Sequence, residues 1–119
     1  MLVVNRFIVG VDDATDFSER AGLALAALAA RPGYVRGTLG RAYDDPTHWS
    51  LTTEWESVGA YRRALGGFDV KVTATPLLAQ SIDEPSAYEI LARTDDHGAL
   101  TTTVSDRATD ADHTLRSRP

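Results

Sequence analysis

The sequence predicts a small α+β protein of the ferredoxin-like βαββαβ type, in which two helices cover one face of an antiparallel four-stranded sheet. Three observations lead to this class. Stretches rich in β-branched and aromatic residues alternate with stretches whose apolar residues recur at helical spacing. A length of 119 residues with 43% apolar residues suits one globular domain. The sequence has no cysteine, so the fold must be stable without disulfides.

The N-terminal third predicts a strand followed by a helix. Residues 2–10 are apolar at odd and even positions, as expected for a strand that is covered on both faces. The helix should run over about residues 15–30, where Phe17 begins a set of apolar residues at helical spacing. Pro32 and Gly33 should end it, because the residue before proline avoids the helical region and glycine is common after a helix.

The central part predicts a β-hairpin. Residues 34–43 form its first strand, residues 44–47 form a polar turn, and residues 48–56 form its second strand. The second strand has the clearest alternation in the chain. Its residues Trp49, Leu51, Thr53 and Trp55 should share one face, with His48, Ser50, Thr52 and Glu54 on the other.

A second helix and a last strand complete the pattern. Ser57 can cap a helix over residues 58–65 that turns Val58, Tyr61 and Leu65 inward. Residues 68–79 are ambiguous, because their valines favour a strand whereas a capping aspartate and paired leucines favour helical turns, and we interpret them as helix. Residues 88–91 predict a short final strand.

We expect the domain to cover residues 1–92. The remaining residues, 93–119, are polar and have only Leu100, Val104 and Leu115 as sizeable apolar groups. Such a segment cannot bury enough apolar surface to offset its ordering entropy. We therefore expect residues 93–119 to be a mostly loose tail.

Charge and hydropathy exclude several classes of partner. The formal net charge of −5 is opposite to the basic face that a nucleic-acid-binding module normally carries. The longest apolar run, residues 21–30, is half of the roughly 20 residues that span a bilayer. The first residues show no signal peptide, and we expect a cytoplasmic protein that binds neither nucleic acid nor membrane.

The faces of the sheet predict a homodimer. Helices can cover only one side of a four-stranded ferredoxin-like sheet. The first strand is nevertheless apolar on both faces, and the third strand carries Trp49 and Trp55 on a single face. A second copy of the same chain is the simplest cover for the other side.

Three local stretches carry a resemblance to a known family. They are Val-Val-Asn-Arg-Phe-Ile-Val at 3–9, Arg-Pro-Gly-Tyr at 31–34, and Thr-Glu-Trp-Glu-Ser at 53–57, which leads into a helix with Ala60 and Tyr61. With their order and spacing, residues 2–92 resemble the antibiotic biosynthesis monooxygenase superfamily of dimeric α/β-barrel proteins.

The resemblance implies a function and a site. The implied reaction is the oxidation of a small phenolic or anthrone-like molecule by dioxygen, without cofactor or metal, in a pocket between the helices and the sheet. Asn5 and the Trp55 indole N–H would be the hydrogen-bond donors, and Tyr61, Leu65 and Phe68 would line the pocket. In the haem-degrading branch, Asn5 and Trp55 match two site positions, but residues 58–79 contain no histidine for the third.

Each candidate residue also has a structural interpretation. Asn5 lies in an apolar strand, so its amide either pairs with neighbouring backbone or points into a cavity. Trp55 either packs in a core or interface or directs its N–H to a ligand. The sequence does not distinguish among the four tyrosines as hydroxyl donors to a pocket. The alternative function is a non-catalytic binding module of the same fold, followed by haem binding or degradation.

Overall fold

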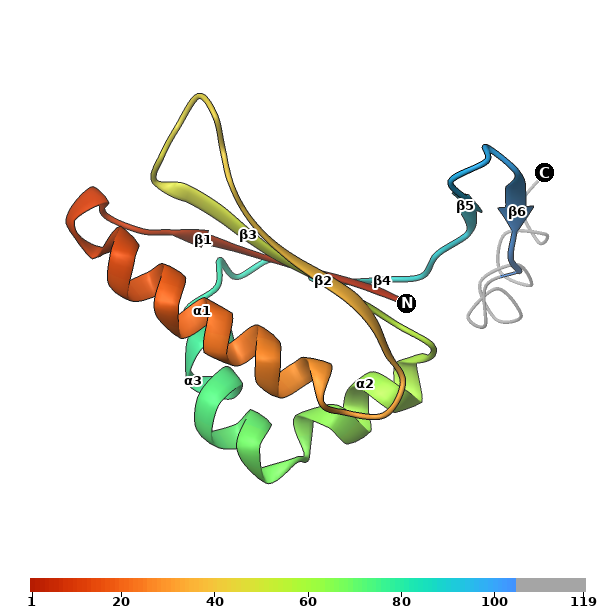
Figure 1. Ribbon diagram of the computed structural model, residues 1–119, viewed down its shortest axis with the longest axis horizontal. Helices are drawn as coiled ribbons and strands as arrows, with labels where there is room; N and C mark the ends of the chain where they lie inside the picture. The colour runs from red at the N-terminus through yellow and green to blue at the C-terminus, as the bar shows by residue number, and fades with distance from the viewer. Residues whose placement is uncertain (105–119) are drawn as a thin grey trace, which may run out of the picture. The chain divides into compact units, whose positions relative to one another are not determined.

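A computed structural model describes residues 1–104, which fall into two compact units, Met1–Tyr88 and a second unit that begins at Glu89. The first unit holds a four-stranded antiparallel sheet with strand order β2-β3-β1-β4 (Figure 1). The strands are β1 (Leu2–Ile8), β2 (Tyr34–Arg41), β3 (His48–Trp55) and β4 (Ala87–Tyr88). The predicted fold class is confirmed. The final strand is shorter than expected and begins one residue earlier, because β4 pairs with only two residues of β1.

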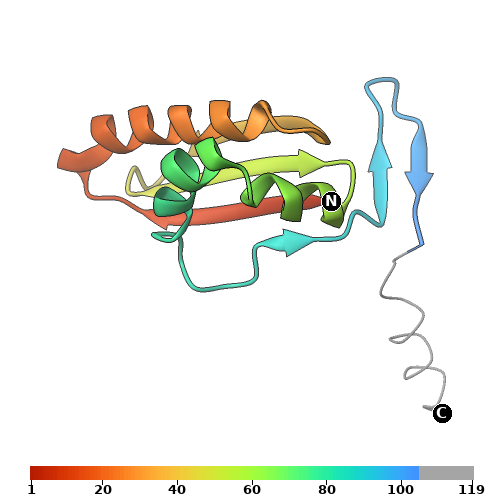
Figure 2. The ribbon, with the colours of Figure 1, turned by 90° about the horizontal axis from the view of Figure 1, so that it is seen from below.

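All helices of this unit lie on one face of the sheet (Figures 1 and 2). A short 3-10 turn, η1 (Val11–Asp13), leads into α1 (Ala14–Ala29). Helix α2 (Val58–Leu65) begins where the Ser57 side chain accepts a hydrogen bond from the Ala60 backbone N–H at 3.0 Å. The predicted bounds of both helices agree with the structure within one or two residues, although the N-cap of α1, Asp13, makes no side-chain capping hydrogen bond. Val58, which we expected to face inward, is 38% exposed.

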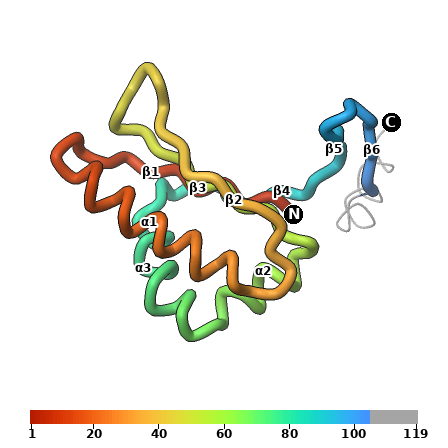
Figure 3. The backbone as a smooth tube through the Cα atoms, in the orientation of Figure 1, coloured from red at the N-terminus to blue at the C-terminus, as the bar shows by residue number. Residues whose placement is uncertain are grey.

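The ambiguous segment is helical, as we interpreted it, but its helix is irregular. A π-helical turn, η2 (Val70–Ala74), continues into α3 (Thr75–Leu78). The chain follows this path directly after α2, as the tube in Figure 3 shows. The valine at position 70 is fully buried, which satisfies its apolar character without a strand. For this segment, burial in the tertiary structure favoured helix over the strand that its valines locally prefer.

The core lies between the sheet and the helices. Every second residue of β3 is buried there, as the alternation predicted, and so is every second residue of β1 from Val3 onward. Trp49 packs edge-on against Phe17 of α1, with ring centroids 5.3 Å apart. The tryptophan face of β3 is therefore covered by the chain's own helices. This corrects our use of the two tryptophans as a sign of a partner.

The opposite face of the sheet is mixed in character. It carries the half-buried Leu2 and Val4, the exposed Ile8, and Arg6. Arg6 donates two hydrogen bonds to Glu84, from Nε to Oε1 at 2.6 Å and from Nη2 to Oε2 at 2.9 Å. The neighbouring positions on β3 are polar. The apolar residues on this side lie on β1 and at Tyr88 of β4, which is opposite Leu2 and 48% exposed.

The second unit holds a hairpin of β5 (Ala92–Thr94) and β6 (Leu100–Thr102). Asp95 shapes its turn by accepting hydrogen bonds from the backbone N–H groups of His97 and Ala99. Gly98 has φ +81°, a conformation that glycine adopts at little cost. Both strands are exposed. The hairpin lies in the segment that we expected to be mostly loose, and residues 105–119 of that segment lie outside the described residues.

Helix length bears on membrane insertion. In the part of the chain that the structure describes, no helix is both long enough and apolar enough to cross a bilayer.

Candidate functional site

Two polar side chains, Asn5 and Thr53, are buried in the described part of the protein. Both lie on the face of the sheet that the helices cover. Asn5 on β1 is opposite Leu51, and Thr53 on β3 is opposite Val3, so the two are diagonal neighbours across the paired strands. Such diagonal positions are about 7–8 Å apart. The two buried polar residues therefore lie close together on this face of the sheet.

The Asn5 amide has no protein partner that would account for its burial. Its residue is 8% exposed. Within the described residues, no hydrogen bond of the side-chain amide is found. The amide atoms of Asn5 are not among the fully enclosed side-chain atoms without a partner in the described residues. The amide therefore keeps a small accessible surface, where water or a ligand can satisfy it. Of the two interpretations of Asn5, the structure does not show pairing with neighbouring backbone.

The Trp55 indole N–H is engaged within its own strand. Nε1 donates to Thr53 Oγ1 at 2.9 Å, in a buried hydrogen bond. Trp55 is 1% exposed, so the indole is enclosed by the core. The N–H that the resemblance assigns to a ligand thus has a protein acceptor. The Thr-x-Trp spacing was the sequence signal for this contact, because residues two apart on a strand share a face.

Two tyrosines flank Trp55. The ring of Tyr34 lies edge-on to it at 5.4 Å between centroids, and the ring of Tyr61 lies at 5.5 Å. Burial raises the pKa of both hydroxyls, which keeps them protonated as possible donors. Gly37 makes room for this cluster, because a Cβ there would collide with the Tyr34 hydroxyl and lie 2.5 Å from Leu25 Cδ1. Of the four tyrosines, the structure places Tyr34 and Tyr61 beside Trp55.

The expected lining residues are only partly brought together. Tyr61 contacts Trp55, and Leu65 is half-buried against the core on the next turn of α2. Phe68 is 78% exposed beyond the end of that helix. Leu65 and Tyr61 therefore belong to the interior beside Trp55, whereas the Phe68 side chain lies at the surface.

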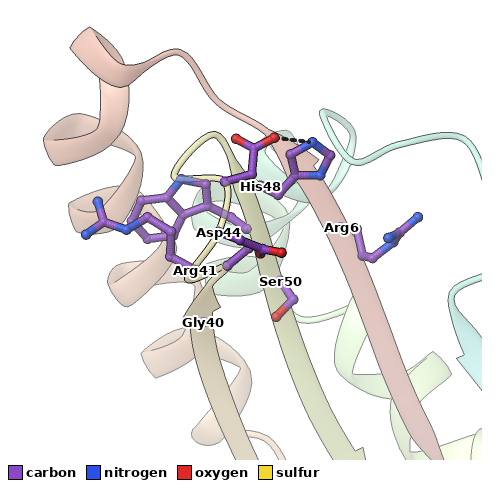
Figure 4. Close-up of a pocket in the computed structure, with 9 residues that line it drawn as sticks. Arg6, Gly40, Arg41, Asp44, His48 and Ser50 are labelled. Atoms are coloured by element: carbon purple, nitrogen blue, oxygen red, sulfur yellow. Dashed lines mark ion pairs between the residues drawn. The ribbon is translucent and has the colours of Figure 1, made fainter.

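A second candidate region lies at the turn between β2 and β3. A hollow of about 480 Å³ there is lined by charged and polar side chains of both signs (Figure 4). His48 Nε2 lies 3.2 Å from Asp45 Oδ2, and hydrogen bonds from Thr47 hold the pKa of Asp45 below its usual value. Both partners are about half exposed. The lining residues are Arg6, Gly40, Arg41, Ala42, Asp44, Asp45, His48, Trp49 and Ser50.

Trp49 borders this hollow and contrasts with Trp55. Its Nε1 is buried and has no hydrogen-bond partner among the described residues, and the Arg41 guanidinium lies 5.2 Å from the ring centroid. Trp49 and Trp55 occupy the same face of one strand. They therefore form a matched pair in which one indole N–H is satisfied and the other is not.

The donor groups near either region do not form a metal site. Among residues 1–104, no cluster of three histidine or carboxylate side chains is placed to hold a metal ion. The chemistry that the buried region can supply is hydrogen bonding by amide and hydroxyl groups in an apolar interior.

Comparison with known proteins links this geometry to a family. The family model for antibiotic biosynthesis monooxygenase matches residues 1–74, which include Asn5, Thr53 and Trp55. The crystal structure of SnoaB, a cofactor-independent oxygenase from Streptomyces nogalater, is 33% identical in sequence with a TM-score of 0.60. That similarity covers 76% of this chain and 94% of SnoaB.

Two further relatives extend the comparison. A 42.8 kDa protein in the whiE locus of Streptomyces coelicolor is 35% identical over 69 residues, which are 57% of this chain. The match spans only 17% of that relative's length. The structure of a conserved protein from Methanosarcina mazei has a TM-score of 0.60 at 16% identity. That similarity covers 72% of this chain and 84% of the Methanosarcina chain. The last likeness concerns the fold alone.

Proposed function

Because the chain belongs to the antibiotic biosynthesis monooxygenase family, we propose that it is a cofactor-independent monooxygenase acting on a small phenolic or anthrone-like molecule. The similarity to SnoaB supports the type of reaction. The observation that carries the proposal is the buried amide of Asn5, which has no hydrogen-bond partner among the described residues and lies beside Thr53 in an otherwise apolar interior. A buried hydrogen-bond donor of this kind is suited to stabilising an oxyanion that develops on a substrate.

The reaction can be balanced without a cofactor. An anthrone loses a proton from its CH₂ carbon, and the resulting anion gives its electrons to dioxygen. A C–O bond forms, and the resulting peroxide anion takes up a proton in place of the one lost from carbon. The hydroperoxide then loses its hydroxyl group and the remaining hydrogen on carbon as water. The carbon becomes a carbonyl, one oxygen atom stays on it, and the other leaves as water. The protein has to favour the anion and exclude water from the oxygenated intermediate.

Each proposed site residue has a distinct part in this reaction. The Asn5 amide donates a hydrogen bond to the oxyanion that develops when the substrate is deprotonated. The Trp55 ring forms an apolar wall, and Tyr61 and Leu65 line the adjoining interior. Because burial raises the pKa of Tyr61, its hydroxyl stays protonated and can donate to the substrate. Phe68 would act at the exposed rim.

We also propose that the working protein is a homodimer. The support is the apolar part of β1 on the sheet face that the helices leave open, where Ile8 is 64% exposed. A second copy that covers this face would remove it from water. Sedimentation at micromolar concentration should give about twice the chain mass of 12.9 kDa, and a stable species of the single-chain mass would contradict the dimer.

The substitution Asn5→Leu tests the catalytic proposal. Leucine has a similar volume but no donor, so it removes the buried polar group without leaving a large cavity. The rate of dithranol oxidation, measured as dioxygen uptake, should fall by about 10²–10³-fold, the usual loss for one oxyanion donor. Thermal stability should be unchanged or higher, because an unpaired buried amide is replaced by an apolar group.

A structural role for Asn5 gives the opposite pattern, with lower stability and little change in turnover. If the wild type oxidises no anthrone or phenol at all, the monooxygenase proposal is wrong. A non-catalytic binding module of the same fold would then be the better description.

A further inference from the structure

The Thr53 hydroxyl, together with Trp55, carries an inference that rests on the proposed function and assigns a new residue to it. We propose that Thr53, rather than the Trp55 indole N–H, is the second hydrogen-bond donor to the substrate oxyanion beside Asn5. Trp55 is then a positioning residue that holds the Thr53 hydroxyl. The ligand chemistry is that of an enolate or phenolate oxygen.

The direction of the buried hydrogen bond is the first argument. An indole N–H can only donate, so Thr53 Oγ1 is the acceptor in the 2.9 Å contact with Trp55 Nε1. The hydroxyl hydrogen of Thr53 must therefore point to a different atom. Within the described residues, no acceptor for that hydrogen is found. Thr53 is 3% exposed, so bulk water does not readily satisfy it.

The register of the sheet is the second argument. Thr53 and Asn5 are diagonal neighbours on β3 and β1, and both face the helices. An oxygen atom held between diagonal neighbours can accept from both side chains. Trp55 lies two residues further along β3, away from Asn5, by roughly 7 Å. Of the two donors on β3, the Thr53 hydroxyl is the one closer to the unpartnered amide.

The polarisation of the hydroxyl is the third argument. When a hydroxyl oxygen accepts a hydrogen bond, its own O–H becomes a stronger donor. The contact from Trp55 also restricts the rotation of the Thr53 hydroxyl, which spares the ordering entropy when an anion binds. The chain of donors runs from the Trp55 N–H to the Thr53 hydroxyl and then to the oxyanion. This arrangement gives the buried indole N–H a function without contact with the substrate.

Four variants test the assignment. Thr53→Val removes the hydroxyl and keeps the shape, Thr53→Ser keeps the hydroxyl, and Trp55→Phe removes the indole N–H. Thr52→Val is the matched control, because Thr52 precedes Thr53 on β3 but faces the other side of the sheet. Melting temperatures of all four establish that the variants are folded.

Two quantities are measured for each variant. The first is turnover of dithranol. The second is the ionisation of bound 1,8-dihydroxyanthraquinone, a phenolic probe that cannot undergo the oxidation and changes colour on losing its proton. In the wild type, the two donors should lower the pKa of the bound phenol relative to the free probe.

We expect Thr53→Val to lose turnover by at least about 10²-fold and to raise the pKa of the bound probe. Thr53→Ser should restore both within a few-fold. Trp55→Phe should have a smaller effect than Thr53→Val, because the hydroxyl remains. Thr52→Val should match the wild type.

The two candidate donors predict opposite orders of activity for Thr53→Val and Trp55→Phe. Thr53→Val frees the Trp55 N–H, so if that N–H were the donor, this variant would keep its activity while Trp55→Phe would lose it. That result would overturn the assignment, as would a folded Thr53→Val with unchanged probe ionisation.

The proposed function can fail separately. A wild type that binds the probe but oxidises no anthrone refutes the monooxygenase, while the probe ionisation still decides for or against Thr53. If the wild type oxidises dithranol but does not bind the probe, turnover alone decides, and a folded Thr53→Val with unchanged turnover overturns the assignment.

Discussion

Gly33 joins α1 to β2, and its replacement by alanine is a sharp test of the packing beneath the site. Gly33 has φ +87°, and a Cβ at this position would overlap the Cβ of Ala60 on α2. The Gly33 carbonyl also accepts a hydrogen bond from the Glu56 backbone N–H at 2.8 Å, and the next residue, Tyr34, contacts Trp55. The residue therefore ties the end of α1 to the end of β3.

Two costs add in Gly33→Ala. A left-handed conformation costs an L-residue about 1–2 kcal/mol. Overpacking against a buried neighbour costs about 1–3 kcal/mol, and Ala60 is 3% exposed. The free energy of unfolding should fall by about 2–5 kcal/mol in total. For a domain of this size, even the lower value lowers the melting temperature by about 8 °C.

Thermal unfolding followed by circular dichroism measures this loss, and tryptophan fluorescence reports whether Tyr34 has moved from Trp55. Gly22→Ala is the control, since Gly22 lies inside α1 with no atom within 4 Å of an added Cβ. That change should raise stability by about 0.5–1 kcal/mol. Gly33→Ala with a melting temperature within about 2 °C of the wild type would refute the reasoning.

Three further predictions concern the core, the ion pairs and the second unit. Trp49→Phe should cost less stability than Trp55→Phe, because only Trp55 loses a buried hydrogen bond, worth about 1 kcal/mol; equal losses in chemical denaturation would contradict this. The Arg6 guanidinium lowers the pKa of Glu84, so the stabilising pair is present at neutral pH and is lost as pH falls through that lowered pKa. Glu84→Gln should therefore melt below the wild type at neutral pH in low salt and converge with it in strong acid, and a difference that persists in acid would argue against the pair. A chain that ends at Arg93 should keep its melting temperature within a few degrees, on the scale of about 4–8 °C per kcal/mol, whereas a larger fall would show that the removed residues stabilise the first unit.

Local signals were sufficient to predict much of the fold. The predicted α1 and α2 match the observed helices because caps, prolines, glycines and apolar spacing act over a few residues. The alternation along β3 predicted which of its residues are buried, since side chains on a strand change face at every step. Asn5 was conspicuous in the sequence as one amide in an apolar strand. Each of these properties belongs to a short segment.

The remaining properties of the site depend on which segments meet. The alternation placed Trp49 and Trp55 on one face, but only the packing of the helices showed that this face is the chain's own core. Only the register of β1 against β3 brought Thr53 beside Asn5, and only the fold placed Tyr34 and Tyr61 against Trp55. Side-chain periodicity fixes a residue's face relative to its own strand. Strand pairing and helix packing, set by residues far apart in the chain, decide what that face meets.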